Sequence, residues 1–213
     1  MKEFYSHLPA KLDRHIRSTQ KGFSLITTLI LLVVVTVLGV GASQMVLLAE
    51  RSTRFDRDQQ IAFQAAEAAL LDAEFDIRGP GGSRKDVFSG TDSENVNFVE
   101  ACGSGATFKG LCSGEPFNNK PVWYAVDFTD QSATARTVQF GQFTGRAFST
   151  GATGIRPEIL PRYIIEVLPD QTPGQRVTGG NKKVLYRVTA MGFGPRKQTQ
   201  AVVQMIFRKE LSP

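Results

Sequence analysis

The chain has 213 residues, with 25 basic and 20 acidic side chains, a net charge of +5 and a pI of about 9.4. Both histidines, His7 and His15, lie among the first 22 residues, so the rest of the chain has no imidazole for a catalytic triad or a metal site. We therefore expect a non-enzymatic protein with no catalytic residues, no metal and no cofactor.

An uncharged apolar stretch of 27 residues runs from Phe23 to Ala49. A helix of about 20 apolar residues crosses the hydrocarbon core of a bilayer, so this stretch is long enough to span a membrane with some tilt. A helix-forming run from Glu50 to Ile77 follows directly, and no proline occurs until Pro80. The sequence therefore predicts one helix of roughly 55 residues and about 80 Å, apolar over 23–49 and amphipathic over 50–78.

The apolar stretch opens with the sequence KGFSL, residues 21–25. This pattern closely resembles the class III signal of type IV prepilins, in which prepilin peptidase cuts after the glycine and methylates the new terminal phenylalanine. The resemblance implies cleavage between Gly22 and Phe23, N-methylation of Phe23, and removal of residues 1–22 as a leader. A secretory signal is cut after its apolar region, whereas this site precedes it, so the apolar segment stays in the mature protein. The alternative is a plain single-span anchor in which Gly22 has no role.

The charge of the first 22 residues indicates the orientation in the membrane. Five basic and two acidic side chains give this segment +3, which leaves +2 of the total +5 for the mature chain. Cytoplasmic flanks of membrane helices carry an excess of Lys and Arg, so we expect the N-terminus in the cytoplasm, the apolar helix in a bacterial inner membrane, and residues 79–213 outside. After assembly, the subunit is expected in an extracellular pilus. Some pilins bind DNA, but the small charge of the mature chain favours no nucleic-acid partner.

The fifth residue after the expected cleavage site is Thr27, where most pilins have glutamate. In the apolar filament core that carboxylate offsets the terminal amine of the adjacent subunit, because an unpaired buried ammonium is costly. Thr27 accepts a hydrogen bond but neutralises no charge. At the filament tip nothing lies above the subunit, and a tip pseudopilin of type II secretion lacks the glutamate too. Thr27 therefore favours a priming role at the tip, with drift at a tolerant position as the alternative.

Two glycines, Gly39 and Gly41, lie inside the apolar helix, where each costs about 1 kcal/mol relative to alanine. The corresponding part of the helix often stretches inside pilin filaments, so the resemblance implies a weak point at Gly39 and Gly41. The alternative is close packing of these small residues against another membrane helix.

The run from residue 50 to 78 is amphipathic, because apolar residues recur at helical spacing and charged residues such as Glu67 and Asp72 occupy other positions. The apolar stripe comprises Phe55, Ala62, Ala66, Ala69, Leu70, Ala73 and Ile77. Its alanines would let a sheet approach the helix closely. Gly79 and Pro80 are expected to end the helix, since glycine adopts the left-handed cap and proline cannot continue it.

The only two cysteines, Cys102 and Cys112, lie ten residues apart. Outside the cytoplasmic membrane thiols are kept oxidised, so an isolated pair at this spacing predicts a disulfide. A metal site would need two further ligands, and the chain offers there neither histidine nor a CxxC pair.

The segment around the cysteines, residues 83–122, is rich in Gly, Ser, Asn and Asp and predicts a long loop with at most one short element. Residues 122–128, VWYAVDF, predict the first strand by their aromatic and β-branched content. Residues 129–157 are polar and glycine-rich, and predict a loop or an irregular pair of strands.

Three further strands are predicted near the C-terminus, at 162–168, 183–190 and 200–207. In the second, Val184, Tyr186, Val188 and Ala190 alternate onto one face, and in the third Ala201, Val203, Met205 and Phe207 do so. The short turns between them favour an antiparallel meander that packs one face on the helix.

The helix sequence FQAAEAALLDAE and the C-terminal sequences PRYIIEVLP, YRVTAMGFG and AVVQMIFR resemble PilX-type minor pilins of the type IV pilus assembly machinery. The resemblance covers the N-terminal third and the last quarter of the chain. It implies an α+β, type IV pilin-like fold, in which the long N-terminal helix packs on a C-terminal antiparallel β-sheet.

The function that the resemblance implies is that of a minor pilin that primes pilus assembly, is incorporated at or near the tip, and supports piliation, twitching motility and adhesion. The expected partners are prepilin peptidase, other minor pilins, the major pilin, the inner-membrane assembly platform and, before assembly, membrane lipid. The alternatives are a type II secretion pseudopilin and a surface adhesin that uses residues 83–160 on a pilin anchor.

Overall fold

The structure is a computed structural model that describes residues 23–79, 84, 87–88, 97–114, 120–149, 154–170 and 183–209. The chain divides into two units, Met1–Arg51 and Ser52–Pro213. The expected leader, including Gly22, lies outside the described residues.

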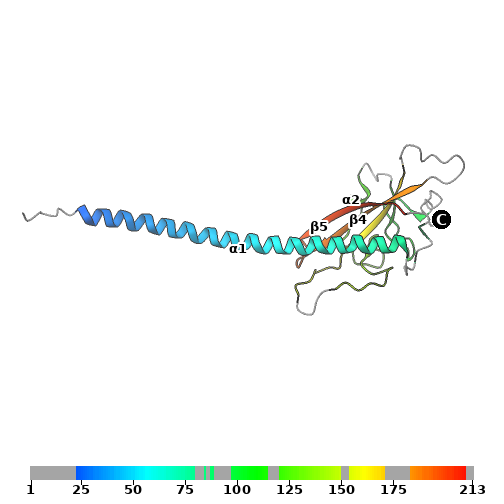
Figure 1. The fold of residues 1–213 in the computed structure, drawn as a ribbon, viewed down its shortest axis with the longest axis horizontal. Coiled ribbons are helices and arrows are strands. Elements are labelled where there is room, and N and C mark those ends of the chain that lie inside the picture. The colour runs from blue at the N-terminus through cyan, green and yellow to red at the C-terminus, as the bar shows by residue number, and fades with distance from the viewer. Residues whose placement is uncertain are drawn as a thin grey trace, which may run out of the picture. The chain divides into compact units, whose positions relative to one another are not determined.

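The helix α1 is continuous from Phe23 to Arg78, 56 residues, so the predicted single helix is confirmed (Figure 1). In the first unit, none of the side chains from Ser24 to Arg51 is buried. By length and composition, α1 could cross a membrane. It ends as predicted, because Gly79 has a φ of 76° and its N–H donates to the carbonyl oxygen of Phe75 at 2.9 Å.

The sheet of the second unit has the strand order β1-β3-β4-β5, and the short strand β2 pairs with β3. The strands are β1 (Leu111–Ser113), β2 (Val138–Gln139), β3 (Arg162–Pro169), β4 (Val184–Phe193) and β5 (Gln200–Phe207). The last three form the predicted antiparallel meander, in which Val188 lies opposite both Ile165 and Met205. The α+β class is therefore confirmed, but β1 runs parallel to β3, so the sheet is mixed.

The second half of α1 packs on this sheet through its smallest side chains. The stripe residues Ala62, Ala66, Ala69, Ala73 and Ile77 are fully buried. At the closest approach, a Cβ added to Gly192 of β4 would lie 2.0 Å from the carbonyl oxygen of Ala62, so only glycine fits there. Phe55, which the sequence placed on the stripe, is 56% exposed instead. The reason is that burial of α1 begins one turn later, at Asp58.

Apolar side chains cover both faces of the sheet. Tyr163, Tyr186 and Val188 pack with the buried alanines on the α1 face, so the predicted inward face of β4 is confirmed. On the opposite face, Ile164 and Phe193 pack with the segment around the cysteines and with residues 122–128.

The prediction of a strand at residues 122–128 is wrong. The structure has a short helix there, α2 (Val122–Ala125), which follows Pro121 and begins with a turn from Tyr124 N–H to the Pro121 carbonyl at 2.9 Å. Val122 and Val126 are both buried. The helix ends at Ala125, and Val126 already has an extended backbone with φ −112° and ψ 144°. The aromatic and β-branched content of the segment therefore favoured a strand where the chain first makes one helical turn. The short elements β1 and β2 lie within the two segments that the sequence predicted as mainly loop.

Candidate functional site

The first candidate for function is the apolar surface of α1 between Ser24 and Ala49. Leu25, Leu38 and Met45 are 71%, 67% and 72% exposed, and the described part of the chain buries no side chain of this segment. An exposed apolar surface of this extent is found where a protein meets lipid or another protein.

Four hydroxyl groups of this segment bond to carbonyl oxygens of the helix itself. Thr27, Thr28 and Thr36 donate to carbonyl oxygens three residues earlier at 2.8–2.9 Å, and Ser43 donates to Gly39 at 2.9 Å. Groups satisfied in this way need no water, which is the condition for a helix surrounded by lipid or packed in a dry helix bundle. Sequence reasoning did not use this feature, although hydroxyl residues inside an apolar helix are its signal.

The residues singled out from the sequence in this segment lie on one unbroken helix. Phe23 is its first residue and Thr27 lies one turn further on, partly exposed. Gly39 and Gly41 are helical, and a Cβ added to either would meet nothing within 4 Å. The isolated chain thus shows open space around both glycines, and the weak point inside a filament stays a prediction.

The cysteine pair is bonded. Cys102 and Cys112 form a disulfide whose Cα atoms lie 4.1 Å apart, and the structure describes no free cysteine. Both are buried on the sheet face opposite α1. Ala101 and Cys102 have positive φ angles of 54° and 65°, so the turn that closes the loop uses a left-handed backbone at two non-glycine residues. This bond fixes the chain that leads into β1.

A buried ion pair, which sequence reasoning missed, joins the end of α1 to the loops. Nε of Arg84 donates to both carboxylate oxygens of Asp76 at 3.0 Å, and its Nη1 donates to the Lys109 carbonyl at 2.6 Å. The hydroxyl of Tyr163 on β3 donates to Asp76 at 2.9 Å. Burial, and then the negative charge of Asp76, raise the pKa of Tyr163 well above 10, so its hydroxyl stays protonated. The cluster holds helix, loop and sheet in one arrangement.

One turn earlier, Asp72 fixes a second loop on α1. Its carboxylate accepts hydrogen bonds from Gly141 N–H at 2.7 Å and from the Thr144 hydroxyl at 2.5 Å, and Arg146 lies 3.7 Å away. Burial raises the pKa of Asp72 above 3.8, and these donors offset part of that effect. The only signal in the sequence was the position of Asp72 and Asp76, four residues apart beside the alanine stripe.

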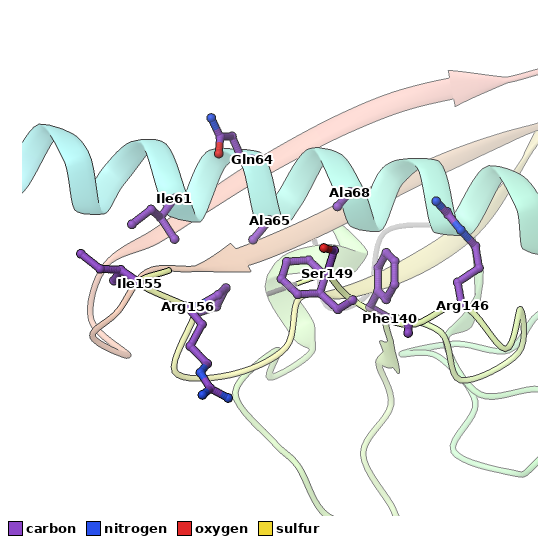
Figure 2. A pocket seen from close by; sticks show the side chains of 12 residues that line it. Ile61, Gln64, Ala65, Ala68, Phe140, Arg146, Ser149, Ile155 and Arg156 are labelled. Carbon is purple, nitrogen blue, oxygen red and sulfur yellow. The ribbon is translucent and has the colours of Figure 1, made fainter. Parts of the chain in front are cut away.

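A groove of about 370 Å³ lies between α1 and the segment that follows β2 (Figure 2). It is lined by Ile61, Gln64, Ala65, Ala68, Phe140, Arg146, Ala147, Phe148, Ser149, Ile155, Arg156 and Pro157. Phe140 and Phe148 contact each other edge to face at 5.2 Å. Ser149 is the one hydroxyl in this lining, and the chain after residue 22 has no histidine that could activate it. Among the described residues, the groove offers a partly apolar surface on which a ligand or another protein could bind.

The neighbouring acidic side chains of Asp127 and Asp130 accept hydrogen bonds from residues two positions further on. Asp127 accepts from Thr129, and Asp130 accepts from Ser132 N–H at 2.8 Å, which lowers the pKa of Asp130. Among the residues that the structure describes, no three His, Cys, Asp or Glu side chains are placed to hold a metal ion.

An exposed apolar helix segment that continues into a helix packed on an antiparallel meander defines a subunit of the type IV pilin class. Within this class, the family described as type IV pilus assembly protein PilX, C-terminal part, matches residues 89–209, and the PilX N-terminal family matches residues 21–71. The first match alone covers more than half of the chain, so the chain belongs to the PilX family of type IV pilus minor pilins. The match to residues 89–209 also includes the middle region, in which the sequence motifs showed no resemblance. No curated protein and no solved structure matches the chain.

Proposed function

We propose that this minor pilin primes pilus assembly in the bacterial inner membrane and is then incorporated at or near the pilus tip. The observation that carries the proposal is the state of the first half of α1: a long apolar surface, covered by nothing in the described chain, with threonine at position 27. Before assembly, lipid covers this surface, and on assembly the helices of other minor pilins and the major pilin replace the lipid.

The proposal includes processing by prepilin peptidase. Cleavage between Gly22 and Phe23 removes a segment of charge +3 from the end of α1 and leaves the terminal amine of Phe23 at the start of the apolar helix. The cationic segment sets the orientation during insertion, with residues 79–213 outside. Once it is removed, the subunit can leave the bilayer, because no charged leader has to follow the helix into an apolar filament.

Thr27 supports a position at the tip. Its hydroxyl already donates to the Ser24 carbonyl at 2.9 Å, and it carries no charge that could offset a buried ammonium. A subunit placed beneath another one would leave that neighbour's amine unpaired at this level. A subunit at the top of the filament has no such neighbour, so threonine there costs nothing. A priming complex that starts the filament remains at its tip when later subunits are added below it.

The processing step is tested by mass spectrometry of the mature chain. We expect a peptide that begins with N-methylated Phe23. A mature chain that begins at Met1 or beyond Ala42 would contradict the proposal.

The position is tested by deletion of the gene and by gold labelling of sheared pili from a strain that carries a C-terminal epitope tag. We expect few pili and loss of twitching motility and adhesion in the deletion strain, with restoration by the tagged chain, and label at one filament end. Label along the shaft, or normal piliation without the gene, would overturn the proposal. A normal pilus with lost secretion would instead identify a pseudopilin of type II secretion.

A further inference from the structure

The strand β5 forms one edge of the sheet. Its eight residues pair with β4 on one side, and in the described part of the chain no strand pairs with the other side. In an antiparallel pair every second residue directs its N–H and C=O away from the partner strand. The outward-directed backbone groups are those of Gln200, Val202, Gln204 and Ile206. The Gln200 carbonyl accepts a hydrogen bond from the Gln59 side chain at 3.2 Å, so the outward edge that a further strand can use begins after this carbonyl. The opposite edge of the sheet is formed by two short strands, β1 with three residues and β2 with two, so it offers less backbone for pairing.

Nothing in the sequence of β5 blocks pairing. Gln200–Phe207 contains no charge, no proline and no glycine, whereas natural sheets protect an exposed edge with charges, proline, bulges or short strands. On the face away from α1, Val202 and Ile206 are 42% and 67% exposed. On the face toward α1, Val203, Met205 and Phe207 are half-buried. A strand added to this edge would extend two apolar faces at once.

Basic residues flank the uncharged strand at both ends. Arg196 and Lys197 precede it, and Arg208 and Lys209 follow it. Arg196 and Arg208 contact Asp58 and Asp170, yet their side chains are still 65% and 48% exposed. Lys209 is partly buried and donates to the Phe88 carbonyl oxygen. If two copies of β5 paired antiparallel, the basic end of one would lie opposite the basic end of the other, and like charges directly opposite are destabilising. The charge pattern thus disfavours a second copy of this chain and favours a strand with acidic ends.

We propose that β5 is a docking edge for an extended strand of a partner protein, uncharged and apolar over about eight residues and acidic at both ends. Main-chain hydrogen bonds to β5 supply the affinity, and the basic flanks select the partner and its register. The proposal deepens the proposed function, because it assigns a protein contact to the second unit, Ser52–Pro213, called the head below. This contact does not involve the apolar half of α1.

A peptide tests the charge pattern directly. The probe is a ten-residue peptide of alternating valine and threonine with aspartate at both ends, and the control has lysine at both ends. With the full chain in detergent micelles, the aspartate peptide is expected to slow amide hydrogen exchange at every second residue of β5 and to leave β3 unchanged. Equal binding of both peptides, or no protection of β5, would overturn the proposal.

Substitutions in β5 test whether the peptide binds at this edge of the sheet. The double variant Val202→Ser with Ile206→Ser is expected to weaken binding of the aspartate peptide by roughly three- to thirty-fold, since each position removes an apolar cross-strand pair and adds no charge. The matched control is Tyr124→Ser, which places a serine at a residue that is 63% exposed on α2, away from β5. Exchange of the β4 amides reports whether the β4–β5 pair is intact. Equal binding by the double variant with an intact pair would contradict the edge assignment.

In cells, a photo-crosslinking amino acid at position 206 identifies the occupant. We expect an adduct with a separate pilus protein, at a strand with acidic ends. An adduct within the same chain would show that its own segment covers the edge and would overturn the proposal. If deletion of the gene abolishes piliation but the double variant assembles normally and forms no adduct, the docking edge fails while the priming function stands.

Discussion

The two halves of α1 belong to one helix but meet opposite conditions. In the first half, large apolar residues such as Leu25 and Leu38 are 71% and 67% exposed. In the second half, small residues such as Ala66 and Ala69 are fully buried on the sheet. The second half also carries large exposed residues, with Phe63, Leu71 and Phe75 at 46%, 52% and 44%, but it has a buried stripe that the first half lacks.

The two halves of α1 therefore have different binding partners. The chain itself provides the partner of the second half, so we expect substitutions there to change the free energy of unfolding of the head. The first half finds its partners in lipid and in other subunits, so substitutions there should change insertion or assembly and leave the head intact. Variants in the two halves should therefore differ in whether they change head stability or pilus incorporation.

The largest effect is expected for Asp76→Ala in the second half. This change leaves Arg84 buried without its carboxylate and Tyr163 without its acceptor, and breaking a buried pair in this way costs about 3–5 kcal/mol. Denaturant unfolding in micelles, followed by the fluorescence of Trp123, the single tryptophan, measures it.

The matched control is Glu74→Ala, which removes a partly exposed ion pair with Arg78 on the same part of the helix, 2.8 Å long. Exposed pairs contribute about 0–1 kcal/mol, so this variant should unfold almost like the unmodified protein. Similar losses in both variants would contradict the role of the buried cluster.

A pair of glycine substitutions compares the two halves directly. In the second unit, Gly192→Ala places a methyl group 2.0 Å from the Ala62 carbonyl, and overpacking of this kind costs about 1–3 kcal/mol or more. In the first half, Gly41→Ala meets nothing within 4 Å and favours the helix by about 1 kcal/mol.

Head unfolding and pilus incorporation are measured for both glycine variants. Gly192→Ala should lower the stability of the head. Gly41→Ala should leave head stability unchanged and reduce incorporation into pili, because it strengthens the helix where we predict a weak point. Normal incorporation of Gly41→Ala would refute the weak point and favour close packing of the glycines instead.

The smallest effect concerns the pH dependence of the head. Folding raises the pKa of Asp72 above its ordinary 3.8, so the folded head binds this proton more tightly than the unfolded chain does. The contribution of Asp72 to stability is therefore greatest below pH 3.8 and decreases as the pH rises from there through the raised pKa. Asp72→Asn should flatten that part of the stability curve, measured by unfolding between about pH 3 and 6. An unchanged slope would show that Asp72 does not titrate differently on folding.

The elements that were predicted correctly are those determined by local sequence patterns. A long uncharged stretch, an alanine stripe at helical spacing and three alternating strands gave α1 and the meander with nearly correct ends. The cap at Gly79 followed from the conformational freedom of glycine. The disulfide followed from the compartment and from the absence of any other cysteine.

The parts that were missed depend on contacts between distant residues. β1 has three residues and exists because β3 lies beside it, and no local pattern shows such a pairing. Arg84 lies in a glycine-rich segment, and only the folded chain brings it to Asp76. At residues 122–128, strand propensity favoured the wrong element, because the turn after Pro121 is held by the burial of Val122 against distant residues such as Ile164 and Phe193.

The tip assignment links one side chain of the first half to a place in the filament, and Thr27→Glu tests it most directly. The measurement is the number of copies of this subunit per sheared pilus, in the unmodified strain and in the variant. The control is Thr28→Glu, which places the same carboxylate one residue further on, at a threonine with the same backbone hydrogen bond of 2.9 Å. Surface piliation is followed in all strains.

If the subunit is at the tip, no neighbour's amine needs its fifth residue, so Thr27→Glu should leave copy number and piliation nearly unchanged. If the subunit lies within the shaft, the new carboxylate pairs with an amine that was unpaired. Restoring such a pair is worth on the order of 1–3 kcal/mol, about five- to a hundred-fold in occupancy. A rise of that size in Thr27→Glu, absent in Thr28→Glu, would contradict the tip position.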